Sequence, residues 1–140
     1  MTQKPSVLIV DDAVDDREML VEYLRFCGFP VTEAAGGGEA IQIAATLRPD
    51  VILMDLSMPE MDGWEATRRL KADPLTKNAI IVAMTAHAFQ RERDAARDAG
   101  CAALIVKPFD LEVLADALGR LTSVGLSAFE DARLSDTSPT

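Results

Sequence analysis

Three aspartates directly follow short apolar runs, where a charged side chain is costly. Asp11 and Asp12 come after VLIV, residues 7–10, and Asp55 comes after VILM, residues 51–54. A carboxylate at the edge of a hydrophobic core loses hydration, which is unfavourable unless a cation or a ligand compensates for it. Clustered carboxylates also repel one another, so either some stay protonated or a cation holds them together. The three aspartates therefore indicate a functional site.

The residue types at these positions favour a hard divalent cation. Oxygen-only ligands, with no His or Cys among them, suit Mg²⁺, which uses one or two carboxylates and leaves positions for water and phosphate oxygens. Two more polar residues follow apolar runs: Thr85 after AIIVAM, residues 79–84, and Lys107 after ALIV, residues 103–106. With Mg²⁺ and the lysine neutralising the incoming charge, a carboxylate can attack a phosphoryl group and become an acyl phosphate. The threonine hydroxyl can then donate to a phosphoryl oxygen.

Short apolar runs alternate along the chain with longer segments of helical period. This alternation is typical of repeated βα units, in which helices cover both faces of a parallel sheet. The pattern predicts strands at 7–10, 31–34, 51–54, 79–84 and 103–106, and helices at about 15–27, 38–48, 63–73, 88–99 and 111–121.

Five consecutive βα units predict an α/β fold with an open, doubly wound, flavodoxin-like sheet. Its five parallel strands should follow the order 2-1-3-4-5, with five helices around them and with strand 31–34 at an edge. The carboxyl ends of parallel strands meet at one edge of the sheet, and function in such sheets is found there. The five polar residues should therefore converge as three carboxylates, one hydroxyl and one ammonium.

Apolar residues at helical spacing define the helix faces that should pack on the sheet. These are Met19, Leu20, Tyr23, Leu24 and Cys27 in the first helix, Ala40, Ile41, Ala44 and Leu47 in the second, and Leu111, Leu114, Leu118 and Leu121 in the last. Gly28 is expected to end the first helix, and Asp110 is expected to cap the last one. The basic residues Arg68, Arg69, Lys71, Arg91, Arg93 and Arg97 alternate with acids and should lie on solvated faces.

The composition restricts the class of protein. A chain of 140 residues with 49% hydrophobic residues has the size of one domain with a substantial core. Its 14 basic and 23 acidic residues give a net charge of -9, which disfavours direct nucleic-acid binding and anionic membranes. No apolar run is long enough for a signal peptide or a membrane span, so a cytoplasmic protein is expected. Cys27 and Cys101 lack metal-ligand spacing and should be reduced, mostly buried thiols.

Four short motifs occur in order at the predicted strand ends: VLIVDD, LMDLSMPEMDG, MTA and VKPF. Together they resemble the receiver domain of two-component response regulators, over about residues 6–122. Each motif alone is weak, but the ordered set over five βα units is specific. The resemblance implies a receiver domain at 7–122, an N-terminal extension at 1–6, and a polar tail at 123–140 that we expect to be flexible.

The resemblance also implies roles at the acidic site. Asp55 resembles the phosphoacceptor of the family. Asp12 and Asp55 resemble the direct carboxylate ligands of Mg²⁺, with the backbone carbonyl of Ser57 as a further ligand. Asp11 resembles an acid that acts on the metal through water. The metal and the phosphoryl group would therefore share one aspartate.

Other family positions match residues around this site. Lys107 resembles the phosphate-binding lysine, and Thr85 resembles the hydroxyl that moves when the domain is switched. Pro108 matches a proline that follows a cis peptide bond. Pro59 and Gly63 match the loop that shapes the acceptor side of the pocket.

Two positions depart from the family pattern or vary within it. Three residues before the lysine, where the family usually has Tyr or Phe, this chain has Leu104. We expect Leu104 to be an ordinary, partly exposed strand residue, so that the signal leaves through the segment after Thr85. His87, the only histidine, occupies a position whose side chain tunes access of water to the phosphoryl group, and it should face solvent at the rim.

The resemblance predicts a phosphoryl-accepting signalling switch. A sensor histidine kinase or a histidine phosphotransfer protein would supply the phosphoryl group, and the domain would catalyse its own phosphotransfer and acyl-phosphate hydrolysis. The surface of helix 88–99, strand 103–106 and helix 111–121 would then change toward a downstream target protein, with the chain a monomer or weak dimer. The alternative is a phosphorylation-independent binding module with the same fold.

Overall fold

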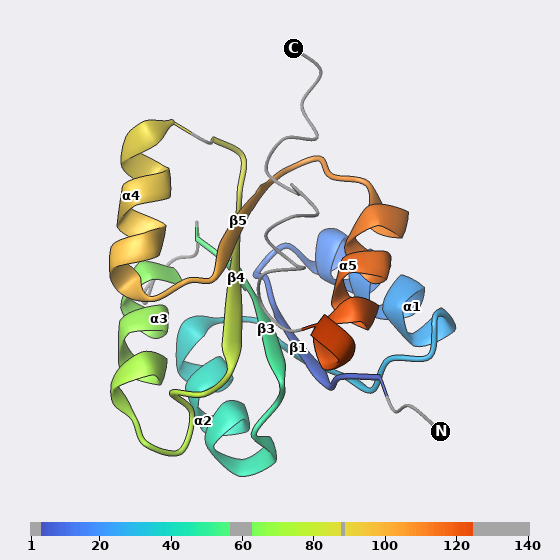
Figure 1. Cartoon of the computed structure of the whole chain (residues 1–140), viewed down its shortest axis with the longest axis horizontal. Coiled ribbons are helices and arrows are strands. Elements are labelled where there is room, and N and C mark those ends of the chain that lie inside the picture. Colours follow the sequence, from blue (N-terminus) through green and yellow to red (C-terminus); the bar gives the residue numbers. More distant parts are fainter. Residues whose placement is uncertain (1–3, 57–62, 88, 125–140) are drawn as a thin grey trace.

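The computed structural model describes residues 4–56, 63–87 and 89–124, and it contains a central parallel sheet of five strands. The strand order is β2-β1-β3-β4-β5, and each strand is followed along the chain by a helix (Figure 1). The predicted α/β fold and strand order are therefore confirmed. The elements are β1 (Val7–Val10), α1 (Val14–Phe26), β2 (Val31–Ala34), α2 (Gly37–Leu47), β3 (Val51–Asp55), α3 (Gly63–Ala72), β4 (Ile80–Thr85), α4 (Gln90–Ala99), β5 (Ala103–Val106) and α5 (Leu111–Val124).

The register of the strands brings their carboxyl ends to one edge of the sheet. Val10 at the end of β1 pairs with Met54, so Asp55 extends one residue beyond that pair. Asp55 in turn pairs with Met84, and Thr85 pairs with Val106 at the end of β5. As predicted, β2 lies at an edge, where its residues are less buried than those of β1 and β3.

Alternation along the strands divides the core between the two faces of the sheet. Val7 and Ile9 point to the face covered by α1 and α5, while Leu8 and Val10 point to the face covered by α2 and α3. All four are completely buried, because each face is covered by helices (Figure 1). The residues of β1, β3 and β4 are therefore apolar up to the strand ends, whereas the edge strand β2 contains Thr32 and Glu33.

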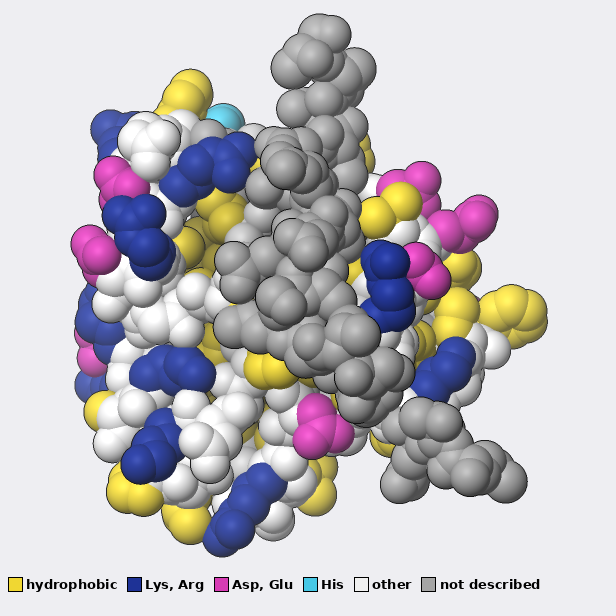
Figure 2. All heavy atoms as spheres, viewed as in Figure 1, with side chains coloured by type: hydrophobic (Ala, Val, Ile, Leu, Met, Phe, Trp, Pro, Cys, Tyr) yellow, Lys and Arg dark blue, Asp and Glu magenta, His cyan; other side chains and the backbone are white. Residues whose placement is uncertain are grey.

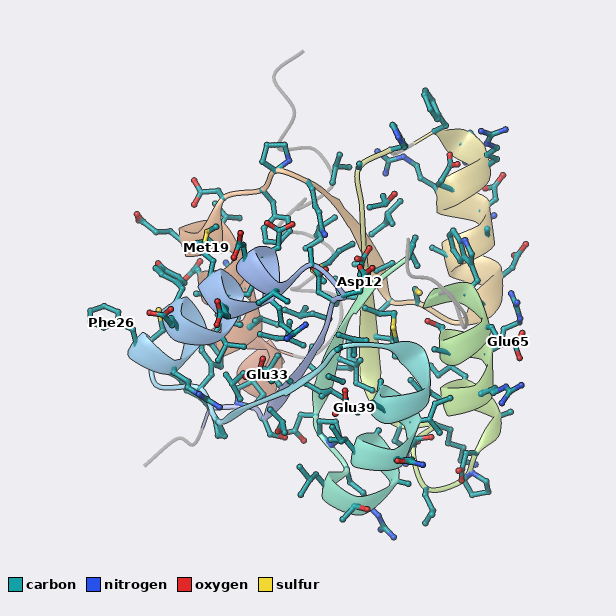
Figure 3. The ribbon with its side chains drawn as sticks, turned by 180° about the vertical axis from the view of Figure 1, so that it is seen from behind. Asp12, Met19, Phe26, Glu33, Glu39 and Glu65 are labelled. Carbon is teal, nitrogen blue, oxygen red and sulfur yellow. The ribbon has the colours of Figure 1, made fainter. Side chains whose placement is uncertain are left out.

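The helix faces differ in part from those predicted. In α1 the buried residues are Leu20, Val21 and Leu24, whereas Met19 is 55% exposed and projects away from the sheet (Figure 3). In α2, Leu47 is 57% exposed, so that prediction was also wrong. Successive residues lie 100° apart around a helix, and the choice between Met19 and Val21 depends on the docking angle of the helix.

The predicted helix boundaries are confirmed to within one or two residues at most ends. Gly28 follows α1 with a φ of 97°, the left-handed conformation that favours glycine. Asp110 Oδ1 accepts hydrogen bonds from the backbone N–H groups of Glu112 and Val113, so the predicted cap of α5 is confirmed. Leu114 and Leu118 of α5 are completely buried, as predicted, while the side chain of Leu121 lies outside the described part.

Helix α4 packs on the sheet differently from the others. Its buried residues are only Ala96 and Ala99. A small apolar cluster beneath it joins Ala96 to Leu56, Ala83 and Leu104. Lys and Arg side chains alternate with acids over the α3 and α4 side of the surface, as the sequence predicted (Figure 2). Among the helices that the structure describes, none has the length and apolarity needed to cross a membrane.

Candidate functional site

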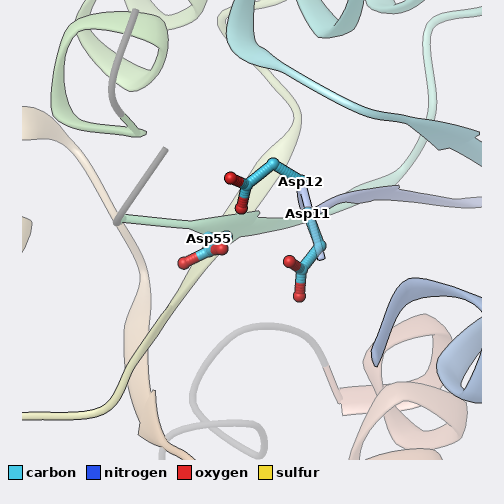
Figure 4. Close-up of side chains that lie close together, drawn as sticks. All are labelled: Asp11, Asp12 and Asp55. Carbon is cyan, nitrogen blue, oxygen red and sulfur yellow. The ribbon is translucent and has the colours of Figure 1, made fainter. Parts of the chain in front are cut away.

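The predicted acidic cluster forms at the carboxyl ends of β1 and β3. Asp55 is the last residue of β3, and Asp11 and Asp12 follow β1 directly. Each of the three offers a carboxylate oxygen, and these oxygens all lie within 4.8 Å of one another (Figure 4). Asp11 is completely buried and Asp55 is 5% exposed, while Asp12 is exposed. The cluster is therefore built into the end of the sheet but can be reached from solvent.

Asp11 is held on several sides. Its Oδ1 accepts a hydrogen bond of 2.9 Å from the backbone N–H of Ala13, and its Oδ2 accepts one of 3.0 Å from Lys107 Nζ. The Arg17 guanidinium donates to the Asp11 backbone carbonyl at 2.8 Å and pairs with Glu33 at 2.8 Å. These contacts fix the turn after β1, so the direction of the Asp11 carboxylate is set before any ligand binds.

Lys107 joins the two ends of the cluster from β5. Its Nζ lies 3.0 Å from Asp11, 3.8 Å from Asp55 and 3.9 Å from Asp16. Burial disfavours the charged lysine, but the hydrogen bond to Asp11 and the charges of Asp55, Asp11 and Asp16 outweigh it and raise the pKa of Lys107. The amine therefore remains protonated throughout the neutral range. The peptide bond between Lys107 and Pro108 is cis, as the resemblance implied.

Thr85 ends β4 beside this cluster and is 5% exposed. Its backbone carbonyl accepts a hydrogen bond of 2.7 Å from the Lys107 N–H, which ties the two strand ends together. Its Oγ1 accepts a hydrogen bond of 3.1 Å from the backbone N–H of His87. The hydroxyl proton is left for a further acceptor, since an alcohol oxygen can accept and donate at the same time.

Gly63, the first residue of α3, approaches the backbone of β3 too closely for any side chain. A Cβ at this position would lie 2.3 Å from the Asp55 carbonyl oxygen and 2.7 Å from the Leu56 Cα. Backbone atoms cannot yield in the way that a flexible side chain can, so only glycine fits here. The contact holds the start of α3 against the end of β3 at Asp55. Ser57 and Pro59, for which the sequence predicted roles, lie outside the described residues.

Leu104 is buried, which corrects the prediction that it is partly exposed. It is 7% exposed and packs with Leu56, Ala83 and Ala96 under α4. The prediction failed because α4 covers β5 at this point, and sequence alone did not place the helix there. His87, in contrast, is exposed as predicted.

Two residues near the cluster were missed as members of the site. The carboxylate of Asp16, in the first turn of α1, lies 3.9 Å from Lys107 Nζ. Arg17 had no assigned role, although it bonds the Asp11 carbonyl. Both residues are in the first turn of α1, directly after the strand that ends at the acidic cluster, and that position is the signal that could have identified them.

The donor set fits a divalent cation. Three carboxylates face one ammonium group, Lys107, so negative charge remains in excess at the strand ends. All three groups supply oxygen, and one of them is exposed, which leaves room for water ligands. This is the chemistry that Mg²⁺ selects in proteins.

Comparison with known proteins identifies the family. The model of the response regulator receiver domain matches residues 7–119 of the chain. The chemotaxis protein CheY of Thermotoga maritima is 39% identical over 118 residues, which cover 83% of this chain and 96% of the relative. The match therefore extends over almost the whole length of that protein.

Solved structures support the same assignment. The chemotaxis protein CheY4 of Vibrio cholerae superimposes with a TM-score of 0.79 at 32% identity, covering 84% of this chain and 98% of the other. The receiver domain of the sensor histidine kinase PA1611 of Pseudomonas aeruginosa gives a TM-score of 0.76 at 34% identity, covering 84% and 96%. That structure has a magnesium ion coordinated in its active-site cleft.

Proposed function

This chain belongs to the response regulator receiver domain family, and we propose from this premise that Asp55 accepts a phosphoryl group from a phosphohistidine donor. The observation that carries the proposal is the position of the Asp55 carboxylate. It lies at the end of a buried strand, 3.8 Å from the Lys107 ammonium and within 4.8 Å of the oxygens of Asp11 and Asp12. The Asp55 carboxylate therefore lies close to the positive charge of Lys107 and to the two aspartates that would help it to bind Mg²⁺.

The transfer is a displacement at phosphorus. An oxygen of Asp55 attacks the phosphorus atom, the bond from phosphorus to the donor imidazole nitrogen breaks, and the imidazole leaves with the electron pair. The product is an acyl phosphate on Asp55. Lys107 is positioned to pair with a phosphoryl oxygen, and its raised pKa keeps it charged for this role. Thr85 Oγ1 can donate its proton to another oxygen of the group.

Asp11, Asp12 and Asp55 are the described residues that would hold Mg²⁺, with the Ser57 carbonyl as the further expected ligand. When bound, the ion supplies positive charge against the phosphoryl oxygens as the transition state forms. The exposed Asp12 and the buried Asp55 offer direct ligands, whereas Asp11 is already bonded to Lys107. Because its carboxylate is already paired with Lys107, Asp11 is expected to act on the metal through water rather than as a direct ligand.

Hydrolysis returns the switch to its resting state. A water molecule attacks the phosphorus, the bond from phosphorus to the Asp55 oxygen breaks, and inorganic phosphate and a free carboxylate result. The domain thus catalyses its own phosphotransfer and its own reset. We propose that a sensor histidine kinase or a histidine phosphotransfer protein is the donor, and that this exchange takes place in the cytoplasm.

A groove beside Lys107 gives the donor a route to Asp55. It runs between α1 and the start of α5 and is lined by Asp11, Asp16, Met19, Leu20, Lys107, Pro108, Phe109 and Leu111. Within this lining, Lys107 lies 3.8 Å from Asp55. Most of this lining is apolar, so a helical donor could bury side chains here while its histidine reaches the acceptor. After transfer, the α4, β5 and α5 surface changes toward a downstream target protein.

Intact mass measurement tests the central assignment. With Mg²⁺ and a small phosphodonor such as acetyl phosphate, the chain should gain one phosphoryl group that is released in base. Asp55→Asn should abolish the gain, because an amide cannot form the acyl phosphate. Unchanged labelling of that variant would remove Asp55 as the acceptor.

A metal titration tests the proposed Mg²⁺ ligands. Asp12→Ala should lose most of the affinity for Mg²⁺, measured by the fluorescence of Trp64. An unchanged affinity would show that the metal binds at another site.

The second candidate is a binding module that works without phosphorylation. Leu104, in place of the usual aromatic residue, is the observation that favours it. The intact cluster of Asp11, Asp55 and Lys107 argues against it, since a module without phosphotransfer has no need for buried charges. Absence of labelling in the unaltered chain with several phosphodonors would support this second function.

A further inference from the structure

Two aromatic rings stack on each other at the segment between Thr85 and α4. The rings of His87 and Phe89 have centroids 5.9 Å apart and planes inclined by 7°, which is an offset-stacked geometry. Both residues are at the surface, and Phe89 remains 62% exposed. Neither residue serves the metal or the phosphoryl group in the proposed mechanism. An exposed stack on a connecting segment therefore calls for another explanation.

The first ring is connected to the switch hydroxyl. The backbone N–H of His87 donates to Thr85 Oγ1 at 3.1 Å, so His87 is attached to the atom that would contact the phosphoryl group. This bond uses one of the two acceptor lone pairs of the oxygen and leaves the hydroxyl proton for another acceptor. Movement of Thr85 toward Asp55 must carry the His87 backbone with it or break this bond.

The second ring is connected to the start of α4. Phe89 is the N-cap residue of the helix, and its carbonyl accepts hydrogen bonds from the N–H groups of Glu92 at 3.0 Å and Arg93 at 3.1 Å. A displacement of Phe89 therefore acts directly on the first turn. The helix can follow, because its buried residues are only Ala96 and Ala99.

The same turn contains an uncompensated buried atom. Glu92 Oε1 is buried with no hydrogen-bond partner among the described residues, although Oε2 accepts a bond from Arg91. A buried carboxylate oxygen that accepts no hydrogen bond has lost its hydration without compensation, which destabilises this position of the side chain. The first turn of α4 is thus weakly fixed in the resting structure.

We propose that His87 and Phe89 are positioning residues whose stacked rings couple the Thr85 hydroxyl to the first turn of α4. The inference rests on the proposed function of Asp55. In this chain the stacked pair takes the part in signal output that an aromatic ring at position 104 would otherwise play. Leu104 lies buried under α4, whereas the stack lies at the surface, next to Thr85 in the chain and at the start of α4.

The experiment uses the full chain with Mg²⁺ and beryllofluoride as the phosphoryl mimic. Phe89→Leu keeps an apolar side chain but removes the ring, and it should change the apparent beryllofluoride affinity by up to about tenfold, because the coupling cannot exceed the free energy of one aromatic pair. It should also abolish most of the change in hydrogen exchange at residues 90–93. Phe89→Tyr and His87→Phe keep two stacked rings and should restore both readouts.

Two controls separate coupling from a general loss of structure. Phe26→Leu removes a ring that is 88% exposed at the end of α1, and it should change neither readout. In a Thr85→Ala background, Phe89→Leu should have no further effect on the affinity, because the pair acts through the missing hydroxyl. An equal effect with and without Thr85 would overturn the inference, as would a normal exchange response in Phe89→Leu. Failure of the unaltered chain to bind beryllofluoride would instead overturn the proposed function.

Discussion

Helices α1 and α5 pack on the sheet through large aliphatic side chains, whereas α4 packs through alanines. Leu20, Val21 and Leu24 of α1 join Leu114 and Leu118 of α5 in one cluster with the inner residues of four strands. The cluster under α4 contains only Leu56, Ala83, Ala96 and Leu104 as buried members. Since burial of apolar area is the main source of stability, the two regions are held to very different extents.

The difference teaches which part of the site is fixed and which part can move. Asp11 and Asp55 end strands whose residues are buried on both sides, and Lys107 ties them together. Thr85 precedes α4 in the chain, and the buried residues of α4 are only alanines. A receiver that must hold a metal site steady and still change its surface needs both kinds of packing. In the proposed function, the tightly packed, fixed half would carry the phosphoryl chemistry and the loose α4 half would change the surface.

The largest expected effect is on the fixed half. Leu24→Ala removes a completely buried side chain between α1 and the sheet, and we expect the free energy of unfolding to fall by about 3 kcal/mol. Urea denaturation measures this change. Met19→Ala on the same helix removes a side chain that is 55% exposed and should change stability by less than about 0.5 kcal/mol. Equal losses in the two variants would contradict the packing described for α1.

Gly63→Ala tests the contact that holds α3 against the acceptor. Because the added Cβ would lie 2.3 Å from the Asp55 carbonyl, the strand end must shift, and we expect a loss of about 2 kcal/mol. Phosphoryl labelling of Asp55 should fall as well, since the carboxylate moves with its backbone. Gly38→Ala is the matched control, because nothing lies within 4 Å of its Cβ. If Gly63→Ala is less stable but is labelled normally, the close contact supports the fold and is not needed to position the Asp55 carboxylate.

Leu104→Ala tests the loose half at one of the buried leucines in the cluster under α4. We expect a smaller loss than for Leu24→Ala, about 2 kcal/mol, because the site borders a thinly packed helix that can collapse toward it. Hydrogen exchange at residues 85–92 should still respond to beryllofluoride, whereas Thr85→Ala should lose the response. If Leu104→Ala silences the response as fully as Thr85→Ala, the leucine itself is the switch element.

The sequence predicted what depends on period and chain order. Alternating apolar runs and helical segments were enough for the strands, their order and the meeting of Asp11, Asp55, Thr85 and Lys107 at one edge. Each of these follows from rules on parallel sheets that need no knowledge of side-chain packing. The same reasoning located the acidic cluster, because apolar strands ending in aspartate are costly unless they serve a site.

The sequence did not predict what depends on docking angles and loop shape. The exposure of Met19 and the burial of Leu104 follow from how α1 and α4 rotate against the sheet. The stack of His87 on Phe89 is a contact between two surface side chains and has no periodic signal in the sequence. The exposure and contacts of these residues depend on tertiary packing, which the local sequence pattern does not encode.

The smallest expected effect concerns the rate at which the loose half opens, and Cys101 can report it. The thiol follows α4 and contacts the cluster around Leu104. Burial raises the pKa of Cys101 to about 11, so at pH 8 the closed form carries very little thiolate and reacts slowly. In a Cys27→Ser background, labelling should therefore proceed through openings of the α4 region. Low urea should leave its rate almost unchanged if these openings are local, whereas a steep rise with urea would mean that α4 opens only with the whole domain.

The same thiol gives the pH dependence a definite sign. The folded pKa lies above the ordinary value of 9.0, so the unfolded chain releases the proton first as the pH rises. The contribution of Cys101 to stability is therefore fully present below pH 9 and is lost as the pH rises toward 11. Cys101→Ala should therefore lose less stability between pH 9 and pH 11 than the unaltered chain, measured as the fall in the urea midpoint. A midpoint that falls equally in both proteins would show that the thiol is not buried under α4, and the contrast between the two halves would lose its most sensitive probe.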